Sequence, residues 1–499
     1  MSRLDLGARC VHTVCRFRIL DGHRGGTLLP SIVVDEGFRP EMPNAFAYLV
    51  LFSWPLVGLV LFRTLPTHKA IIWTILGGYL LLPERTGIDL PLLPAFEKTF
   101  IPLVTALLFC LPKLGSIWEI LPRERLPRVL AVVFLLSPFA TVFTNGDPQV
   151  FGPKVLPGLR PYDAFSFGLS HGMLLIPFLL TQRFIRTDVE LRDLLQALAM
   201  AGLAYSLPAL FEVRMSPQLH IWIYGFFTHS FAQQIRFGGF RPVGSLGHCF
   251  VVGLFLAMGA LATAALSRWH RGAHRLGWAG GSLWLLATRG LAKVVSAWAF
   301  VTLLAPILLL GGRRLQRAVL LGLGLMVLLY PALRGADLIP TDRIEAAAAV
   351  VSEERAASLR FRLDNEDILL ARANERSLLG WGGWGRNRVF DPQTGDDISV
   401  TDGAWGISAG QYGWVGYIAE YGLLVWPLIL IGLGRSAGFT VVALGLVLAA
   451  NLLNLLPNAG LTPLTWAIAG GLTGCLAAVR ARPSPVSGGT MSRRRLAVQ

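Results

Sequence analysis

Apolar runs separated by polar connections cover most of this chain of 499 residues. A helix needs roughly 20 predominantly apolar residues to cross a bilayer, and many of these runs approach that length. The candidate runs cover residues 45–62, 70–82, 100–111, 129–143, 165–180, 194–211, 246–266, 277–287, 291–310, 318–333, 413–433, 440–456 and 461–479. The pattern predicts an all-α, polytopic membrane protein.

The composition favours the same class. The chain is 53% hydrophobic and 15% charged, whereas a soluble protein carries roughly 25% charged residues. Its net charge of +15 is also typical of nucleic-acid-binding proteins. However, the cations cluster in short connections at 183–192, 268–275, 313–317 and 480–495, which the positive-inside rule assigns to the cytoplasm. We therefore expect membrane lipids, and no nucleic acid, as partners.

Each span carries the chain to the other side of the membrane, so the basic connections also fix the side of the remaining connections. With the basic connections and the C-terminus inside, the loops 212–245 and 334–410 lie outside. Thirteen spans would place the basic N-terminal segment outside as well, so we expect about 12 spans, with one early run re-entrant or interfacial. The predicted parts are a polar segment 1–43, helices within 44–333, the large loop 334–410, helices within 411–480 and a basic cytoplasmic tail 481–499.

The large loop 334–410 differs from the rest of the chain. It holds 9 Arg, no Lys and 13 Asp or Glu, a net charge of −4. Residues 342–379 contain neither Pro nor Gly, and their apolar positions recur at helical spacing. This pattern predicts one or two amphipathic helices on the outer face, with Gly380 as a helix stop. Loops of this length in a membrane protein often carry function.

Two further features bear on the compartment and on metal binding. The first 40 residues contain no apolar stretch typical of a signal peptide, so we expect none. The five cysteines are scattered, without the spacing of a zinc site or of a disulfide framework.

Three patches together resemble the superfamily of O-antigen ligases and O-antigen polymerases. The segment 241–248, Arg-Pro-Val-Gly-Ser-Leu-Gly-His, is similar to the family's entry into a membrane helix. The segment 286–290, Leu-Ala-Thr-Arg-Gly, is similar to a Thr-x-Ser-Arg-Gly turn. The third patch runs from Arg360 through Gly-Trp-Gly-Gly-Trp-Gly (380–385) and Asp-Gly-Ala-Trp (402–405) to Ala-Glu-Tyr-Gly-Leu (419–423).

The resemblance implies a glycosyltransferase of the bacterial inner membrane. Its donor would be a polyprenyl-pyrophosphate-linked glycan at the periplasmic face, and a flippase and a chain-length regulator would be possible protein partners. Asp402-Gly403 stands where ligases of the family carry His-Asn, which favours a polymerase of O-antigen or exopolysaccharide repeat units. Cys249-Phe250 departs from the Pro-Asn that often follows the first motif.

The leaving pyrophosphate requires fixed positive charge, which arginine supplies in a planar, bidentate form. Arg241 and Arg289 sit at the outer ends of predicted spans, and we expect them to act without a metal or other cofactor. Lys293 lies four residues after Arg289, hence on the same helix face. The alternative for Arg289 is an arginine that snorkels to lipid headgroups.

In the large loop, Arg360 or Arg362 is a candidate for binding substrate, although most charges there are expected to be solvated helix pairs. Asp402 is the candidate general base for the acceptor hydroxyl. The alternative is that Asp402 caps the helix that follows.

Four more residues are weaker candidates for substrate contact. Glu420, inside the next span, is either the partner of an arginine or a second acid–base group. His248 is a structural residue or a site residue. Trp381 and Trp384 stack on sugars or act as interfacial aromatic residues.

Two rival functions remain open. A ligase would use the same pocket but transfer the glycan to a different lipid or protein acceptor. A transporter or flippase for a lipid-linked or anionic substrate predicts paired repeats with broken helices, and the sequence contains no convincing internal repeat. A membrane scaffold would not explain arginines at span ends.

Overall fold

The computed structural model describes residues 42–481 apart from 91–92, 237, 294–295 and 435–436. All elements described below belong to one compact unit that begins at Pro43. The predicted polar segment 1–43 and the basic tail 481–499 lie outside the described residues, except for their innermost positions.

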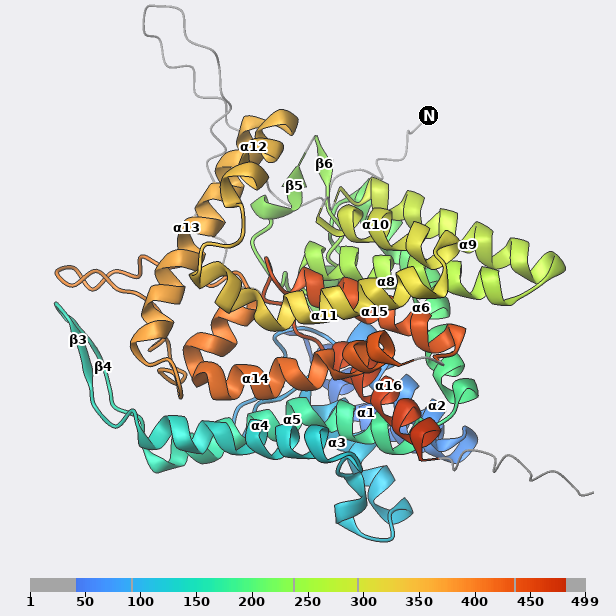
Figure 1. Cartoon of the computed structure of the whole chain (residues 1–499), viewed down its shortest axis with the longest axis horizontal. Coiled ribbons are helices and arrows are strands. Elements are labelled where there is room, and N and C mark those ends of the chain that lie inside the picture. The colour runs from blue at the N-terminus through green and yellow to red at the C-terminus, as the bar shows by residue number, and fades with distance from the viewer. Residues whose placement is uncertain (1–41, 91–92, 237, 294–295, 435–436, 482–499) are drawn as a thin grey trace, which may run out of the picture. The chain divides into compact units, whose positions relative to one another are not determined.

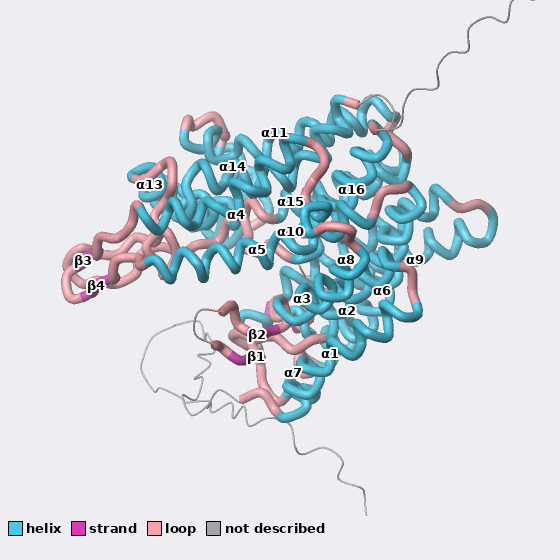
Figure 2. The backbone as a smooth tube through the Cα atoms, turned by 90° about the horizontal axis from the view of Figure 1, so that it is seen from below, coloured by secondary structure: helices cyan, strands magenta, loops and turns pink. Residues whose placement is uncertain are grey.

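The described chain is mostly helical, and Figure 2 shows strands only in short hairpins. The helices are α1 Ala45–Thr64, α2 Thr67–Leu81, α3 Phe100–Cys110, α4 Arg125–Phe143, α5 Pro161–Phe184, α6 Asp188–Met215, α7 Leu219–Tyr224, α8 Cys249–Trp269, α9 Gly272–Leu291, α10 Ser296–Leu310, α11 Arg313–Gly335, α12 Thr341–Val351, α13 Glu353–Glu375, α14 Ala404–Leu433, α15 Phe439–Asn454 and α16 Pro463–Arg480. The antiparallel hairpins pair β1 Gly87–Ile88 with β2 Phe96–Glu97, β3 Gln149–Phe151 with β4 Lys154–Leu156, and β5 Ile235–Arg236 with β6 Gly239–Phe240.

Within these ranges, seven helices are long and apolar enough to cross a membrane: α1, α4, α5, α6, α8, α11 and α14. The prediction of a multi-pass, all-α membrane protein is therefore confirmed in its coarse form, whereas the count of about 12 spans stays a prediction. We call the end of the helices that carries residues 212–248 and 334–403 the loop end. We call the opposite end, with the connections 185–187, 270–271 and 311–312, the basic end.

Helices α1, α2 and α3 run alternately between these ends. The backbone N–H of Asn44, before α1, donates to Tyr224 O at the loop end over 2.9 Å. Lys113 Nζ donates to Thr67 Oγ1 over 2.7 Å, so α2 begins where α3 has ended. The Tyr224 hydroxyl donates to Leu81 O, so α2 ends at the loop end. Of these three helices, α3 is the shortest at 11 residues.

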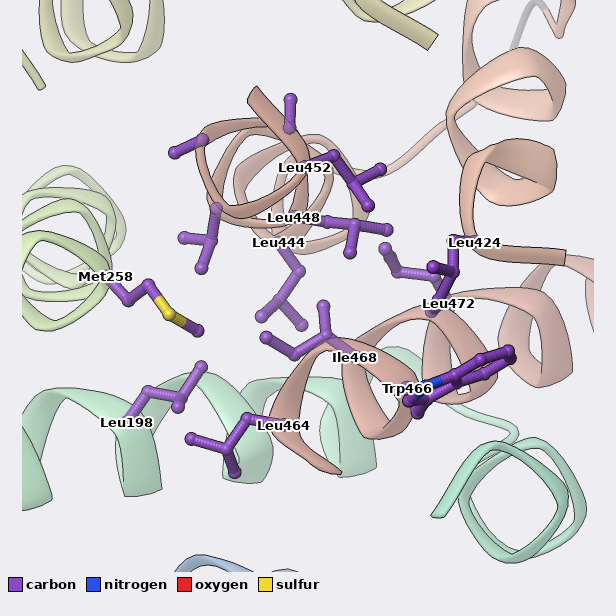
Figure 3. Close-up of a cluster of buried hydrophobic side chains, with 14 of the residues drawn as sticks. Leu198, Met258, Leu424, Leu444, Leu448, Leu452, Leu464, Trp466, Ile468 and Leu472 are labelled. Atoms are coloured by element: carbon purple, nitrogen blue, oxygen red, sulfur yellow. The ribbon is translucent and has the colours of Figure 1, made fainter. Parts of the chain in front are cut away.

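The apolar core is centred on α15, which is buried on all sides. Figure 3 shows its Leu444, Leu448 and Leu452 packed among side chains of α6, α8, α14 and α16. A helix that is apolar all round is expected at the centre of a bundle. Outer helices instead expose large apolar side chains, such as Leu49 and Leu56 of α1, as contact with lipid requires.

The large loop contains the two helices α12 and α13, which confirms the prediction of one or two helices. They are separated at Ser352, whose hydroxyl accepts a hydrogen bond from Arg355 N as the cap of α13. Helix α13 ends at Glu375, five residues before the predicted stop, and Gly380 adopts a φ of 71° in the turn that follows. Figure 1 shows α13 on the same side of the molecule as the β3–β4 hairpin.

Helix α14 is interrupted at Gly413, where φ is 62° and ψ is −166°. The amide groups freed by the interruption bind the turn after α13. Trp414 N donates to Ser377 O over 2.7 Å and Val415 N to Leu378 O over 3.1 Å. The predicted run 413–433 thus corresponds to the second part of α14, and the first part extends the helix back to Ala404.

Candidate functional site

The first motif of the sequence analysis forms a turn before α8 that a buried carboxylate holds in place. Glu212, near the end of α6, accepts hydrogen bonds from Val243 N and Gly244 N over 2.7 Å each and from Leu219 N over 3.1 Å. These charge-assisted bonds satisfy three backbone donors with one side chain. They fix the position of the backbone just after Arg241 and just before His248.

Ser245 adds three more connections to the same turn. Its N–H donates to the Tyr205 hydroxyl over 3.1 Å, and its own hydroxyl donates to Leu80 O. Its carbonyl accepts from Lys98 Nζ. The turn is therefore held from α2, α6 and the segment before α3 together.

Arg241 is a buried cation without a carboxylate partner among the described residues. Its side chain is only 6% exposed. Its Nη1 lies 3.6 Å from Cys249 Sγ, and its guanidinium lies 5.7 Å from the centre of the Phe250 ring. A thiol is a weak acceptor, and Arg241 Nε has no hydrogen-bond partner. Such a group is costly to bury unless an anion joins it.

His248 lies beside Arg241. Its Nδ1 accepts a hydrogen bond from Phe250 N over 3.2 Å as the cap of α8, and its ring packs edge-on against His229 at 4.9 Å. Burial, together with repulsion from His229, Arg241 and Arg362, lowers the pKa of His248 to about 4. His248 is neutral at pH 7, and Arg241 and Arg362 are near enough to influence the same ring.

Arg362 of α13 joins this group from the large loop. Its Nε lies 3.6 Å from Asp402 Oδ2, and its Nη1 donates to Pro457 O over 2.8 Å. The alternative role of Asp402 as a helix cap is wrong, because Gly403 is the cap residue of α14 and no side chain caps that helix. Arg241, His248, Arg362 and Asp402, with His229, form what we call the cation cluster.

One helical turn after Arg362, Glu366 connects α13 to α11. It accepts a hydrogen bond from the Tyr330 hydroxyl over 3.1 Å and lies 3.7 Å from Arg334 Nε. Arg334 also pairs with Asp367 at 2.7 Å. Burial raises the pKa of Glu366 to about 7, despite the opposing effects of Tyr330 and Arg334.

The raised pKa of Glu366 predicts a pH-dependent stability. The folded chain holds this proton up to a pH near 7, whereas a carboxyl in the unfolded chain releases it near 4.5. The free energy of unfolding should therefore fall as the pH rises from about 4.5 to about 7. In Glu366→Gln, which has no carboxyl group to titrate, this decrease in the free energy of unfolding should be absent. Thermal unfolding of both proteins in detergent at several pH values tests this, and superimposable pH profiles would contradict it.

Arg289 lies at the end of a helix, as the sequence predicts, but Lys293 does not continue that helix. Arg289 is fully buried in the last turn of α9. The Ser282 hydroxyl of α9 donates to Ala260 O of the antiparallel α8, which places Arg289 level with a point roughly four residues, about 6 Å, after the start of α8. The expectation that Lys293 continues the same helix face is wrong, because α9 ends at Leu291 and Lys293 has a φ of 56°. Lys293 Nζ instead donates to Arg236 O of the β5–β6 hairpin over 3.3 Å.

Three other candidates, Arg360, Trp381 and Trp384, each contact other side chains of the protein. Arg360 has an exposed side chain that pairs with Glu345 of α12. The guanidiniums of Arg372 and Arg376 lie 3.4 Å and 4.3 Å from the centre of the Trp381 ring, which is buried.

Trp384 is 63% exposed, and its Nε1 donates to Asp163 Oδ1 over 3.0 Å. Of the two tryptophans, Trp384 is exposed and Trp381 is buried.

Glu420 is not the partner of an arginine in the described structure. The Ser408 hydroxyl donates to its Oε2 over 2.5 Å, and both residues are buried on opposite sides of the interruption in α14. Tyr412, Tyr417 and Tyr421 are its other neighbours. This arrangement joins the two parts of α14.

A cavity of about 310 Å³ lies next to the cation cluster. Leu246 and Val251, on either side of His248, form one wall. Residues 459–463, just after the carbonyl that Arg362 binds, form another. The cavity also contains the ion pair between Lys98 Nζ and Glu84 Oε1, at 2.8 Å.

Sequence reasoning missed Glu212, His229 and the Glu84–Lys98 pair. Glu212 follows the apolar run 194–211 directly, and an acidic residue at such a position is a signal of a structural or functional role. His229, Glu84 and Lys98 lie in polar connections, where local sequence offers no comparable signal.

The fold and the site define a polytopic α-helical membrane protein with buried cationic side chains at its loop end. No group of three or more His, Cys, Asp or Glu side chains in the described part of the chain is placed to hold a metal ion. No protein-family model, curated protein or solved structure matches the chain.

Proposed function

We propose that this chain is a glycosyltransferase of the bacterial inner membrane. It would polymerise polyprenyl-pyrophosphate-linked oligosaccharide repeat units into a surface polysaccharide at the periplasmic face. The loop end is then the periplasmic end, and the C-terminus is cytoplasmic. The proposal combines the resemblance of residues 241–248, 286–290 and 360–423 with the geometry of the cation cluster.

The observation that carries the proposal is the buried guanidinium of Arg241, which has no carboxylate partner among the described residues. Arg362 and His248 lie close by, and Asp402 is the acidic member of the cluster. A pyrophosphate would balance the charge of Arg241 and Arg362. Its polyprenyl chain could extend along the apolar outer surface of the helices.

The reaction assigns a role to each member. The acceptor hydroxyl oxygen attacks the anomeric carbon of the donor sugar, and the bond from that carbon to the pyrophosphate oxygen breaks. The bonding electrons leave with the pyrophosphate, whose growing charge Arg241 and Arg362 stabilise. The hydroxyl proton passes to Asp402, which the Arg362 contact holds in place.

The broken helix α14 is the one feature that the transporter alternative shares. In transporters, interrupted helices line a substrate or ion site. Here the amide groups of Trp414 and Val415, just after the interruption at Gly413, already donate to backbone carbonyls of the turn after α13. The interruption therefore serves to attach the large loop, and the transferase remains the better proposal.

Two arginines on the same helix provide the test. Arg362→Ala should lower polymer formation by about 10²-fold, the effect typical of removing one positioned donor to a developing charge. Arg360→Ala should stay within about twofold of the wild type, because exposed ion pairs contribute little. The measurement is the polymer ladder formed in a strain that lacks this chain and is supplied with each variant.

Membrane levels of both variants serve as the control for folding. Full polymer in Arg362→Ala would refute the role of the cation cluster. The chemistry of the product separates the two transferases, since a polymerase yields longer polyprenyl-linked chains and a ligase yields glycan on a different acceptor.

A further inference from the structure

The cavity beside the cation cluster lies where four helices meet at the loop end. The last turns of α2 contribute Ile75 and Tyr79, and the first turn of α3 contributes Pro102 and Leu103. The starts of α8 and α16 close it. These walls are largely apolar, so the few polar groups among them determine what the cavity can bind.

The main polar feature is the ion pair of Glu84 with Lys98. Lys98 is 6% exposed, its Nζ also donates to Ser245 O, and it lies 5.6 Å from the centre of the Tyr79 ring. Burial lowers the pKa of Lys98, and Glu84 opposes that effect. Because the two charges neutralise each other within the cavity, it offers hydrogen-bonding groups without a net charge.

The starts of two helices add donors. Neither Thr99 before α3 nor Thr462 before α16 caps its helix with its side chain. The first amide groups of a helix have no partner within it. Pro102 and Pro463 carry no N–H, and Thr465 N already donates to Thr462 O. The donors left for the oxygen atoms of a ligand are therefore the amides of Phe100 and Ile101 in α3 and of Leu464 in α16. Apolar walls, a neutral charged pair and amide donors together suit an uncharged molecule with many hydroxyl groups.

The volume limits the size of that molecule. About 310 Å³ is at the lower end of the roughly 300–1,000 Å³ of small-molecule pockets. This leaves room for a single sugar unit, not for an oligosaccharide.

We propose that this cavity binds one uncharged sugar unit of the acceptor, and so selects the hydroxyl group that enters the cation cluster. The inference rests on the proposed transferase function and names the acceptor subsite of the same site. Its wall at residues 459–463 follows Pro457, which Arg362 binds, so the sugar and the reactive groups are held by one connected structure.

Filling the cavity from its own wall tests the inference. A Cβ atom at Gly460 would have no atom within 4 Å, so a large side chain can be introduced there without a clash at its base. Polymer formation should fall in the series Gly460→Ala, Gly460→Leu, Gly460→Phe, with a loss of about tenfold or more for Phe, as expected when an acceptor is displaced from its attacking position. Val251→Trp, from the wall formed by α8, should have the same effect.

Gly277→Phe is the matched control. Gly277 lies on the exposed side of α9, away from the cavity lining, and a Cβ atom there would also have no atom within 4 Å. This variant should make normal polymer. Membrane level and unfolding temperature are measured for every variant, and Gly460→Leu replaces Gly460→Phe if the latter is not retained in the membrane.

The outcomes separate the inference from the proposed function. Loss of polymer in the filled variants at normal membrane level, with the single lipid-linked unit accumulating, supports the inference. Normal polymer in the filled variants together with loss in Arg362→Ala would overturn the acceptor subsite and leave the transferase function standing. Normal polymer in the filled variants and in Arg362→Ala would overturn both.

Discussion

Arg241→Ala is expected to lower polymer formation by about 10²–10³-fold, the range observed when one preorganised donor to a developing negative charge is removed. The side chain is buried, lacks a carboxylate partner among the described residues, and lies beside His248 in a turn that Glu212 holds through three hydrogen bonds. Its charge is therefore available to an anion, and its position is fixed before the anion arrives.

Arg241→Lys sharpens this test. Lysine keeps the charge but loses the planar, bidentate contact with phosphate oxygens, so this variant should retain more polymer than Arg241→Ala and less than the wild type. Arg236→Ala is the control, because Arg236 lies in the hairpin just before Arg241 and pairs with the exposed Glu354. The polymer ladder and the membrane level of each variant are measured together. Wild-type polymer in Arg241→Ala would exclude a role in binding the pyrophosphate.

The helices could be predicted from the sequence because burial in lipid imposes a continuous apolar pattern. Even there, the pattern did not reveal where a helix is interrupted. The run 413–433 begins at Gly413, but the helix extends back to Ala404, and the interruption is stabilised by backbone carbonyls of residues 377 and 378. Those bonds come from a part of the chain that is not adjacent in sequence.

The site was harder to predict, because it depends on which side of a helix each charge faces. Arg360 and Arg362 were equal candidates in the sequence, yet residues two apart on a helix face different directions. Arg362 reaches Asp402, and Arg360 reaches Glu345. Asp402 was equally suited to be a cap or a base, and the backbone at Gly403 excluded the cap. Such choices depend on contacts between distant segments.

The attachment of the large loop also depends on contacts between distant segments, and Arg386 makes several of them. It is 1% exposed. Its Nη1 donates to Pro157 O and its Nη2 to Asp147 O, each over 2.9 Å, and its Nε donates to Trp381 O over 3.3 Å. The sequence marks Arg386 only as one of nine arginines in the loop. The structure makes it one of the links between the end of the large loop's helix and turn, 372–386, and the connection from α4 to α5, beside Arg376, which binds Thr144 O and Asp147.

Arg386→Ala is therefore expected to lower the free energy of unfolding by about 3 kcal/mol, at roughly 1 kcal/mol for each of the three hydrogen bonds lost. Asp147 would keep its pair with Arg376 at 2.9 Å, so the loss should come from the backbone groups. Arg386→Lys cannot reach all three carbonyls at once and should be intermediate.

Arg388→Ala, two residues away, removes a half-exposed pair with Asp397 and should cost under about 1 kcal/mol. Thermal unfolding in detergent and protease cleavage within 334–410 measure both effects. Because Arg386 attaches the segment that carries Arg362 and Asp402, its loss should release that segment and reduce polymer formation as well. Unchanged unfolding and cleavage in Arg386→Ala would show that the turn at 381–386 is held by other contacts.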